Sequence, residues 1–202
     1  SILIGVLAAG VSAVMALILG ICAATLGKKV DSAISFAIDT VMGIPHILLL
    51  ILISYAMGKG LKGVIAGVAL THWTSLARLI RGEVMQLRES EYIQIAGKLG
   101  LGKWEIAKKH IVPHVLPQFI VGLVLLFPHA ILHESSITFL GFGLSTEQPA
   151  IGVILSESMR YLIMGKWWLA VFPGMMLVLT VVLFEKGGTA LRQLLDPGSV
   201  HK

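Results

Sequence analysis

Four histidines have the clearest capacity for chemistry in this chain, because all four lie within long apolar stretches. They are His46, His72, His129 and His133. Ionisable side chains inside a membrane-spanning helix are costly and usually face a polar path or a partner. Imidazole is a suitable ligand for nickel, copper and zinc. A peptide route needs no such cluster, so the pattern predicts a path for a divalent metal ion, free or held in a small chelator.

The depth of these histidines along their helices favours a shared site. At a rise of about 1.5 Å per residue, His46 lies about 20 Å from the inner end of its span, His72 about 16 Å and His129 about 21 Å. His133 lies one turn further out on the same helix face as His129. We expect His72, His129 and His133 to be transient metal ligands, and His46 and Glu134 to lie on the same path. The alternative for each histidine is a hydrogen bond to a neighbouring helix.

Two other function classes use similar residues. An intramembrane zinc protease needs the pattern H-E-x-x-H, but Ala130 follows His129 where the glutamate should stand. A proton-coupled carrier could use Asp39 and Glu134, but it does not explain the long charged segment described below. The sequence has no Gly-rich phosphate loop of the Walker type, so any ATP must be hydrolysed by a separate subunit. We therefore expect no enzyme activity and no bound cofactor in this chain.

The composition places the histidines in a membrane protein. Of the 202 residues, 56% are hydrophobic and only 13% are charged, whereas soluble domains carry about 25% charged residues. The single cysteine, Cys22, excludes an internal disulfide framework and a Cys-rich zinc module. The net charge of +5 does not indicate nucleic-acid binding, because the basic residues are distributed as expected for a membrane surface.

Five stretches are long and apolar enough to cross a hydrocarbon core of about 30 Å as helices. They cover residues 1–27, 33–57, 61–80, 115–139 and 168–184. Pro45 is expected to kink the second stretch. The fold class is therefore an all-α integral membrane protein with five transmembrane helices. Because the chain begins inside an apolar run without Met, we expect a six-span parent whose first span is missing.

Basic residues predict the orientation. Twelve of the 16 Lys and Arg residues lie within 28–32, within 78–114 or in the C-terminal tail. The positive-inside rule makes this side cytoplasmic. Residues 141–167 then form an extracytoplasmic loop with short interfacial helices, and Trp167 and Trp168 anchor the outer lipid interface. The chain is expected to be a multi-pass protein in contact with membrane lipid.

A charged segment over residues 83–109 interrupts the apolar stretches. It is predicted to be an amphipathic helix pair on the cytoplasmic side. Its apolar positions are Ile93, Ala96, Leu99 and Trp104. Such a segment can lie on anionic lipid or dock on a partner protein. Four interspersed acidic residues favour the protein partner.

The charged segment resembles the E-A-A loop of ABC importer permeases. Their pattern is E-A-A, three residues, Gly, nine residues, and then I-x-L-P. Here Gln94-Ile95-Ala96 stands at the E-A-A position, Gly100 at the glycine, and residues 110–113, ending in Pro113, at I-x-L-P. Glutamate is replaced by Gln94, whereas the glycine, the proline and the spacing are kept.

Flanking stretches are similar to the C-type permease of the dipeptide, oligopeptide and nickel group. They include Arg78-Leu79-Ile80-Arg81-Gly82, Phe139-Leu140-Gly141-Phe142-Gly143 and Leu195-Asp196-Pro197. Thr71-His72-Trp73 and the His129–His133 pair resemble the nickel branch of this group. The resemblance covers essentially the whole chain.

The resemblance implies one permease domain over residues 1–202, with a cytoplasmic coupling loop at residues 83–113. Its ATPase-coupling residues would be Glu91, Gln94, Ala96, Gly100 and Pro113. The implied partners are a second permease in a heterodimer, two cytoplasmic ATPase subunits and an extracytoplasmic substrate-binding protein, in the bacterial cytoplasmic membrane. We expect the cargo to be nickel or a related divalent metal. Di- or oligopeptides are the alternative cargo.

Overall fold

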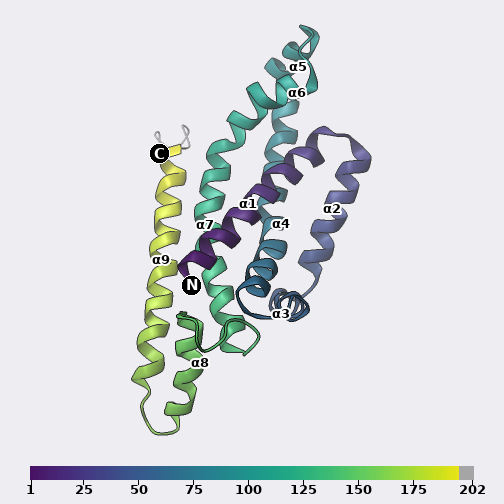
Figure 1. Cartoon of the computed structure of the whole chain (residues 1–202). Helices are drawn as coiled ribbons and strands as arrows, with labels where there is room; N and C mark the ends of the chain where they lie inside the picture. Colours follow the sequence, from purple (N-terminus) through teal and green to yellow (C-terminus); the bar gives the residue numbers. More distant parts are fainter. Residues whose placement is uncertain (196–202) are drawn as a thin grey trace.

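The computed structural model describes residues 1–195, with Lys103 described by its backbone alone. All regular elements in this range are helices (Figure 1), which confirms the predicted all-α fold. In chain order they are α1 (Ile2–Thr25), α2 (Lys28–Gly43), α3 (His46–Ala56), α4 (Gly60–Arg88), α5 (Glu91–Lys98), α6 (Lys103–Ile106), η1 (Ala107–Ile111), α7 (Val112–Phe139), α8 (Ile151–Leu162) and α9 (Trp168–Leu195).

Four helical stretches are long and apolar enough to cross a membrane. They are α1, α4, α9 and the continuous stretch Trp104–Phe139, to which α6, η1 and α7 contribute. The pair α2 and α3 makes a fifth span if the two helices are counted together. The structure therefore agrees with the five predicted spans, although the second of them is not a single helix.

The break in this second span is sharper than the kink expected at Pro45. The axes of α2 and α3 differ by 98°. Proline has no backbone N–H and pushes the preceding residue out of the helical region. Ile44 is accordingly extended, with φ −88° and ψ 136°. As a result α3 begins anew at His46 and crosses the neighbouring helices instead of continuing along α2.

Small residues let α1 pack closely along α4. Ala13 and Ala16 of α1 are fully buried. A Cβ atom added at Gly20 would lie 2.9 Å from the carbonyl oxygen of Ala77, so only glycine allows this approach. In a membrane, where lipid tails are as apolar as the side chains, such close packing is a main source of helix association.

A second close approach joins α3 to α4. A Cβ atom at Gly63 would lie 2.6 Å from the carbonyl oxygen of Ser54, and one at Gly67 would lie 3.3 Å from that of Leu50. The G-x-x-x-G spacing places both glycines on one face of α4. This face therefore sets the distance between α4 and the short helix that begins with His46.

The corner between α3 and α4 is tied to the turn that follows α7. The backbone N–H of Gly60 donates to the carbonyl oxygen of Gly143 at 3.0 Å, and the hydroxyl of Ser54 donates to that of Phe142 at 2.8 Å. The ammonium of Lys59 lies 5.0 Å from the centre of the Phe142 ring. The Phe-Gly pair of this turn thus has a structural role in joining three helices.

Two ion pairs connect α2 to α4. The Arg81 guanidinium donates to both carboxylate oxygens of Asp31, with a distance of 2.7 Å from Nη2 to Oδ2. Arg78 pairs with Asp39 at 2.5 Å. A bidentate Arg–carboxylate pair has a defined geometry, so the half-buried Asp31–Arg81 pair orients α2 alongside α4.

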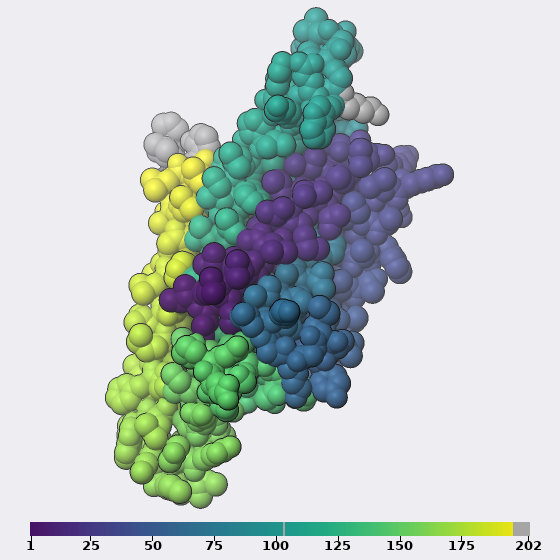
Figure 2. Space-filling model, in the orientation of Figure 1, coloured from purple at the N-terminus to yellow at the C-terminus, as the bar shows by residue number. Residues whose placement is uncertain are grey.

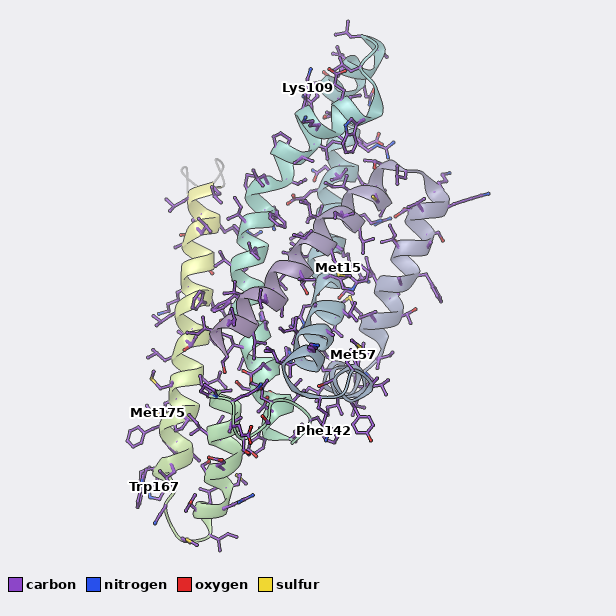
Figure 3. All side chains as sticks on the ribbon, in the orientation of Figure 1. Met15, Met57, Lys109, Phe142, Trp167 and Met175 are labelled. Atoms are coloured by element: carbon purple, nitrogen blue, oxygen red, sulfur yellow. The ribbon has the colours of Figure 1, made fainter. Side chains whose placement is uncertain are left out.

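The charged segment differs in detail from the expected helix pair over residues 83–109. Helix α4 continues to Arg88, so the segment's first residues belong to a long helix. The part that stands apart comprises α5 and α6, which protrude beyond the ends of the other helices (Figures 1 and 2). Lys109 lies toward this end and Trp167 at the opposite end (Figure 3). The two residues were predicted to lie on opposite sides of the membrane.

The expected extracytoplasmic loop, residues 141–167, contains one helix. Helix α8 covers Ile151–Leu162, where a short interfacial helix was expected within the loop. Residues 141–143 form part of a turn instead of a short helix. A Cβ atom at Gly143 would lie 2.2 Å from the Thr138 hydroxyl, so the tight turn requires glycine at this position.

Candidate functional site

Three of the four histidines in the apolar stretches meet at one point. His46 is the first residue of α3, His72 lies in α4, and His133 lies near the end of α7. The ring centroids are 4.7 Å apart for His46 and His72, 4.5 Å for His46 and His133, and 4.9 Å for His72 and His133. One ligand nitrogen from each ring lies within 4.8 Å of those from the other two. We call these residues the histidine triad.

The ring of His72 is held in one orientation by its own helix. Its Nδ1 lies 3.0 Å from the carbonyl oxygen of Val68 and 3.1 Å from the hydroxyl of Thr71. A carbonyl oxygen only accepts hydrogen bonds, so Nδ1 carries the proton. The other nitrogen, Nε2, then presents a lone pair. His72 is only 9% exposed.

The triad borders a pocket of 630 Å³ between the α2–α3 break, α4 and α7. The break contributes Val41, Met42, Gly43, Ile44 and Pro45, α4 contributes Thr71, Thr74 and Ser75, and α7 contributes Leu126 and His129. Several polar side chains therefore converge in an otherwise apolar bundle, as is common for binding sites.

His129 lies apart from the triad. It lines the same pocket, but its side chain is exposed, and the group of close ligand nitrogens found among the described residues contains His46 instead. The expected metal ligands were His72, His129 and His133. The difference arises at Pro45, because the 98° break brings the first turn of α3 against α4 and α7.

Glu134, expected on the substrate path, has different surroundings. Its side chain is completely buried, and its Oε1 accepts a hydrogen bond from the Thr138 hydroxyl at 3.0 Å. The same hydroxyl accepts from the backbone N–H of Leu144 at 3.2 Å. Glu134 is not among the residues that line the 630 Å³ pocket. Its contacts connect α7 to the turn that follows it.

We expect Glu134→Ala to destabilise the protein, because the Thr138 hydroxyl would lose its acceptor and a buried cavity would remain. The expected cost is about 3 kcal/mol. Glu134→Gln keeps an oxygen at the same position and should cost less than about 1 kcal/mol. Thermal unfolding of detergent-solubilised protein, followed by loss of the monodisperse peak, measures both. Equal stability of the alanine and glutamine variants would contradict this role.

The expected coupling residues lie along the protruding end. Glu91 begins α5, whose polar face includes the exposed Gln94, while Ala96 is buried at 8% exposure. Gly100 has φ +89° and ends the turn after α5. Pro113 is the second residue of α7 and directly follows Val112, just after the end of η1 at Ile111. The five residues thus occupy one short region, although not one continuous helix.

The protruding end exposes large apolar side chains. Trp104 is 82% exposed, Leu99 75% and Ile95 53%. No part of the described chain covers them. Exposed apolar groups rimmed by charged residues are typical of a protein-binding surface. We call Ile95, Leu99 and Trp104 the apolar tip.

The apolar tip is connected to α7 without a loop. The helical stretch Trp104–Phe139 runs through the π-helical turn η1 at Ala107–Ile111. Single π-helical turns inside α-helices occur frequently at functional sites. The chain therefore runs as helix, without a loop, from Trp104 of the apolar tip to the part of α7 that carries His133.

A second pocket, of 780 Å³, lies at the base of the protruding end. It is bordered by α4, α7 and α9, and its lining includes Glu83, Tyr92, Pro113, His114 and Arg192. This pocket shares no lining residue with the pocket that the histidine triad borders. None of these residues except Pro113 was expected to be functional.

Sequence reasoning missed two contributors to the site. The carbonyl oxygen of Val68 orients His72, but every helical residue has a carbonyl four positions earlier, so no pattern singles it out. Thr71 is also close to the His72 ring. The adjacency of threonine and histidine in an apolar stretch is a visible signal, but the sequence does not say which way either side chain turns.

Comparison with known protein families identifies the architecture. The family described as "Binding-protein-dependent transport system inner membrane component" matches residues 16–199. The chain belongs to this family. The expected membership in the ABC importer permeases and the location in an inner membrane as a multi-pass protein are thereby confirmed.

Curated members of the permease family resemble the chain over almost its whole length. It is 32% identical over 197 residues to the dipeptide transport system permease protein DppC of Bacillus subtilis, covering 98% of the chain and 62% of that protein. It is also 32% identical to the oligopeptide permease OppC of the same organism, covering 98% and 64%. The chain thus spans less than two thirds of these relatives. Both are named for peptides, so they do not support the nickel branch.

A solved transporter shares the fold of this permease. The chain superimposes with a TM-score of 0.77 on a subunit of the methionine ABC transporter MetNI in an inward-facing conformation, covering 96% of this chain and 91% of the other. The sequences are 16% identical. The comparison therefore supports the helical arrangement.

Proposed function

We propose that this chain is a permease subunit of an ATP-driven importer and forms one side of the translocation path. The apolar tip carries this proposal, because exposed apolar side chains on a charged segment at one end of a membrane protein suit contact with a protein partner. Trp104 is 82% exposed and Leu99 is 75% exposed. ATP would be hydrolysed by that partner, with no cofactor bound in this chain.

The proposed complex contains two permeases, two ATPase subunits and an extracytoplasmic binding protein. The α2–α3 break leaves Met42, Ile44 and Pro45 exposed along the 630 Å³ pocket. A second permease facing this side would close the pocket into a path. No residue in the membrane-spanning window of α9 is fully buried, which suits contact with lipid.

In this complex the ATPases would move the apolar tip, and η1 would pass the movement to α7. Because His133 lies on α7 and His46 and His72 lie on α3 and α4, a shift of α7 changes the spacing within the triad. Alternating access would thus open and close the pocket at the point where the three helices meet.

For the cargo, we propose di- or oligopeptides as the first candidate, because the named relatives DppC and OppC are peptide permeases. Nickel or a related divalent metal is the second candidate. The observation that favours it is the histidine triad, since a peptide path does not need three imidazoles within 4.8 Å. The structure does not support the zinc protease alternative, because that alternative requires His129 and His133 as a pair of zinc ligands and His129 lies outside the triad.

Uptake into vesicles that contain the full complex tests the function. Labelled dipeptide and labelled nickel are offered separately, with ATP or a non-hydrolysable analogue inside, and each is then used to compete with the other. Dipeptide entry that requires ATP and is insensitive to nickel supports peptide cargo. Nickel entry that dipeptides do not inhibit supports metal cargo. The absence of ATP-dependent entry for both, in a correctly assembled complex, would contradict an importer of either cargo.

A further inference from the structure

We infer that His46, His72 and His133 form a binding site for a divalent transition-metal ion, coordinated by one imidazole nitrogen from each of three helices. The inference deepens the proposed function, on which it depends only for placing the site on a translocation path. It differs from the set expected from the sequence, because His46 replaces His129. It also assigns a metal site to a chain whose named relatives are peptide permeases.

The arrangement of the rings fits a shared ion. The three centroid distances of 4.7, 4.5 and 4.9 Å form a nearly equilateral triangle. Imidazoles that share one ion at a metal–nitrogen distance of about 2.0–2.1 Å have ring centres about 5 Å apart. The rings are also inclined to one another by 58° to 75°, so they are not stacked. Such inclined rings can direct their nitrogens toward one point.

The nitrogens themselves are within reach of one ion. Those of the triad lie within 4.8 Å of one another, whereas nitrogens around a tetrahedral ion are about 3.4 Å apart. Side-chain rotation can supply the remaining contraction without a change in the backbone. His46 lies at the first residue of α3, where helical packing restricts its side chain least.

The surroundings of His72 match those of a metal ligand. Metal-bound histidines almost always donate their second ring N–H to a backbone carbonyl or carboxylate, which fixes the tautomer. In His72 the Nδ1 proton is directed to the Val68 carbonyl oxygen at 3.0 Å. Nε2 therefore carries the free lone pair that coordination requires.

Two of the ligand nitrogens are buried without a partner. Nε2 of His46 and Nε2 of His72 have no hydrogen-bond partner among residues 1–195. Buried polar atoms are almost always satisfied, and an exception calls for an explanation such as an ion.

The donor set selects the class of ion. Three neutral imidazoles suit Ni²⁺, Co²⁺, Zn²⁺ or Cu²⁺, whereas Mg²⁺ and Ca²⁺ prefer carboxylate and carbonyl oxygens. The one buried carboxylate nearby in sequence, Glu134, is hydrogen-bonded to Thr138. The site leaves positions open toward the 630 Å³ pocket, so the ion can retain water or a chelator as further ligands.

The test is a titration of the purified full complex with Co²⁺, which gives visible absorption bands that report the geometry and the nitrogen ligands. The complex must carry an affinity tag without histidine. One Co²⁺ bound per copy of this chain, with three histidine nitrogens in its X-ray absorption spectrum, is the expected result. His46→Ala, His72→Ala and His133→Ala should each weaken binding about 100-fold or more, as expected for loss of a direct ligand.

Two further variants make the result specific. His114→Ala removes a histidine outside the triad and should leave the Co²⁺ affinity unchanged. His129→Ala should also retain the three-nitrogen spectrum, because His129 is not among the close ligands. No Co²⁺ bound to the wild-type complex would overturn the inference. A spectrum that is lost in His129→Ala but kept in His46→Ala would overturn it as well.

ATP-driven dipeptide uptake by the same preparations separates this inference from the proposed function. Uptake with no Co²⁺ binding means that the permease function stands and the metal site does not. Co²⁺ binding in a complex that takes up neither dipeptide nor nickel with ATP supports the site while contradicting the importer. Each triad variant is also compared with wild type by size-exclusion chromatography, so that loss of binding in an aggregated protein is not counted.

Discussion

Replacing Gly63 with valine is expected to prevent accumulation of the folded protein. Even the first added atom, Cβ, would lie 2.6 Å from the Ser54 carbonyl oxygen, and a backbone atom cannot rotate away as a side chain can. The expected cost is about 3 kcal/mol or more, a large part of the 5–15 kcal/mol by which proteins are typically stable. Because α3 begins with His46, the same change displaces one member of the triad. Membrane abundance and the thermal midpoint of the solubilised protein measure the effect.

A graded series of alanine substitutions provides the control. Gly67→Ala meets the Leu50 carbonyl oxygen at 3.3 Å, and Gly174→Ala meets nothing within 4 Å. We expect the thermal midpoint to fall most for Gly63→Ala, less for Gly67→Ala and not at all for Gly174→Ala. If the thermal midpoint of Gly63→Ala equalled that of Gly174→Ala, the close approach of α3 to α4 at Gly63 would not require glycine.

Replacing Gly100 with proline is expected to abolish transport while membrane insertion and abundance remain normal. Gly100 has φ +89°, whereas proline is fixed near −65°. The substitution also removes the backbone N–H that donates to the Gly97 carbonyl oxygen at 3.1 Å. The turn after α5 would open and the apolar tip would change its direction, but the membrane-spanning helices would keep their packing. Uptake should fall to the background of vesicles without transporter.

Gly102→Ala is the matched control for this prediction. Gly102 lies two residues further on, its Cβ would meet nothing within 4 Å, and it has no left-handed backbone conformation. We expect its transport rate and ATPase activity to equal those of the wild type. Normal uptake by Gly100→Pro would contradict a coupling role for the protruding end. Lost uptake in both variants would indicate a general sensitivity of the segment to substitution.

Composition and hydropathy were sufficient to predict the membrane-spanning architecture. Stretches such as residues 1–27 and 168–184 are apolar over more than the length that crosses a hydrocarbon core, and no tertiary contact is needed to recognise them. The charged segment that protrudes in the structure was also visible, because its charges interrupt the apolar stretches. These features depend on neighbouring residues in the chain, so the linear sequence is enough to predict them.

The break between α2 and α3 at Pro45 could be predicted from the sequence only in part. A proline within an apolar stretch predicts an interruption, and the structure has one there. The size of the bend, 98°, depends on how α3 packs against Gly63 and Gly67 of α4. These contacts join residues separated along the chain, so the local sequence predicts a kink but not its angle.

The candidate site also has features that the sequence predicts and features that it does not. The residue types and approximate depths of His72 and His133 could be predicted from helix rise and hydropathy. The choice of His46 over His129 as the third member could not, because it depends on the direction in which α3 leaves the break. The placement of Glu134 against Thr138 likewise depends on the rotation of α7 about its axis, which the weak periodicity of a largely apolar helix does not specify.

Residue chemistry along the chain thus determined that this is a helical membrane permease with imidazoles in its apolar helices and a charged segment between them. Only the tertiary structure decided which imidazoles lie close together and that Glu134 is hydrogen-bonded to Thr138 inside the protein. It also decided at which glycines two helices approach closely. The physical reason is that apolarity and charge report the environment of each residue separately. The meeting of three nitrogens depends on the relative positions of three helices, and long-range packing sets those positions.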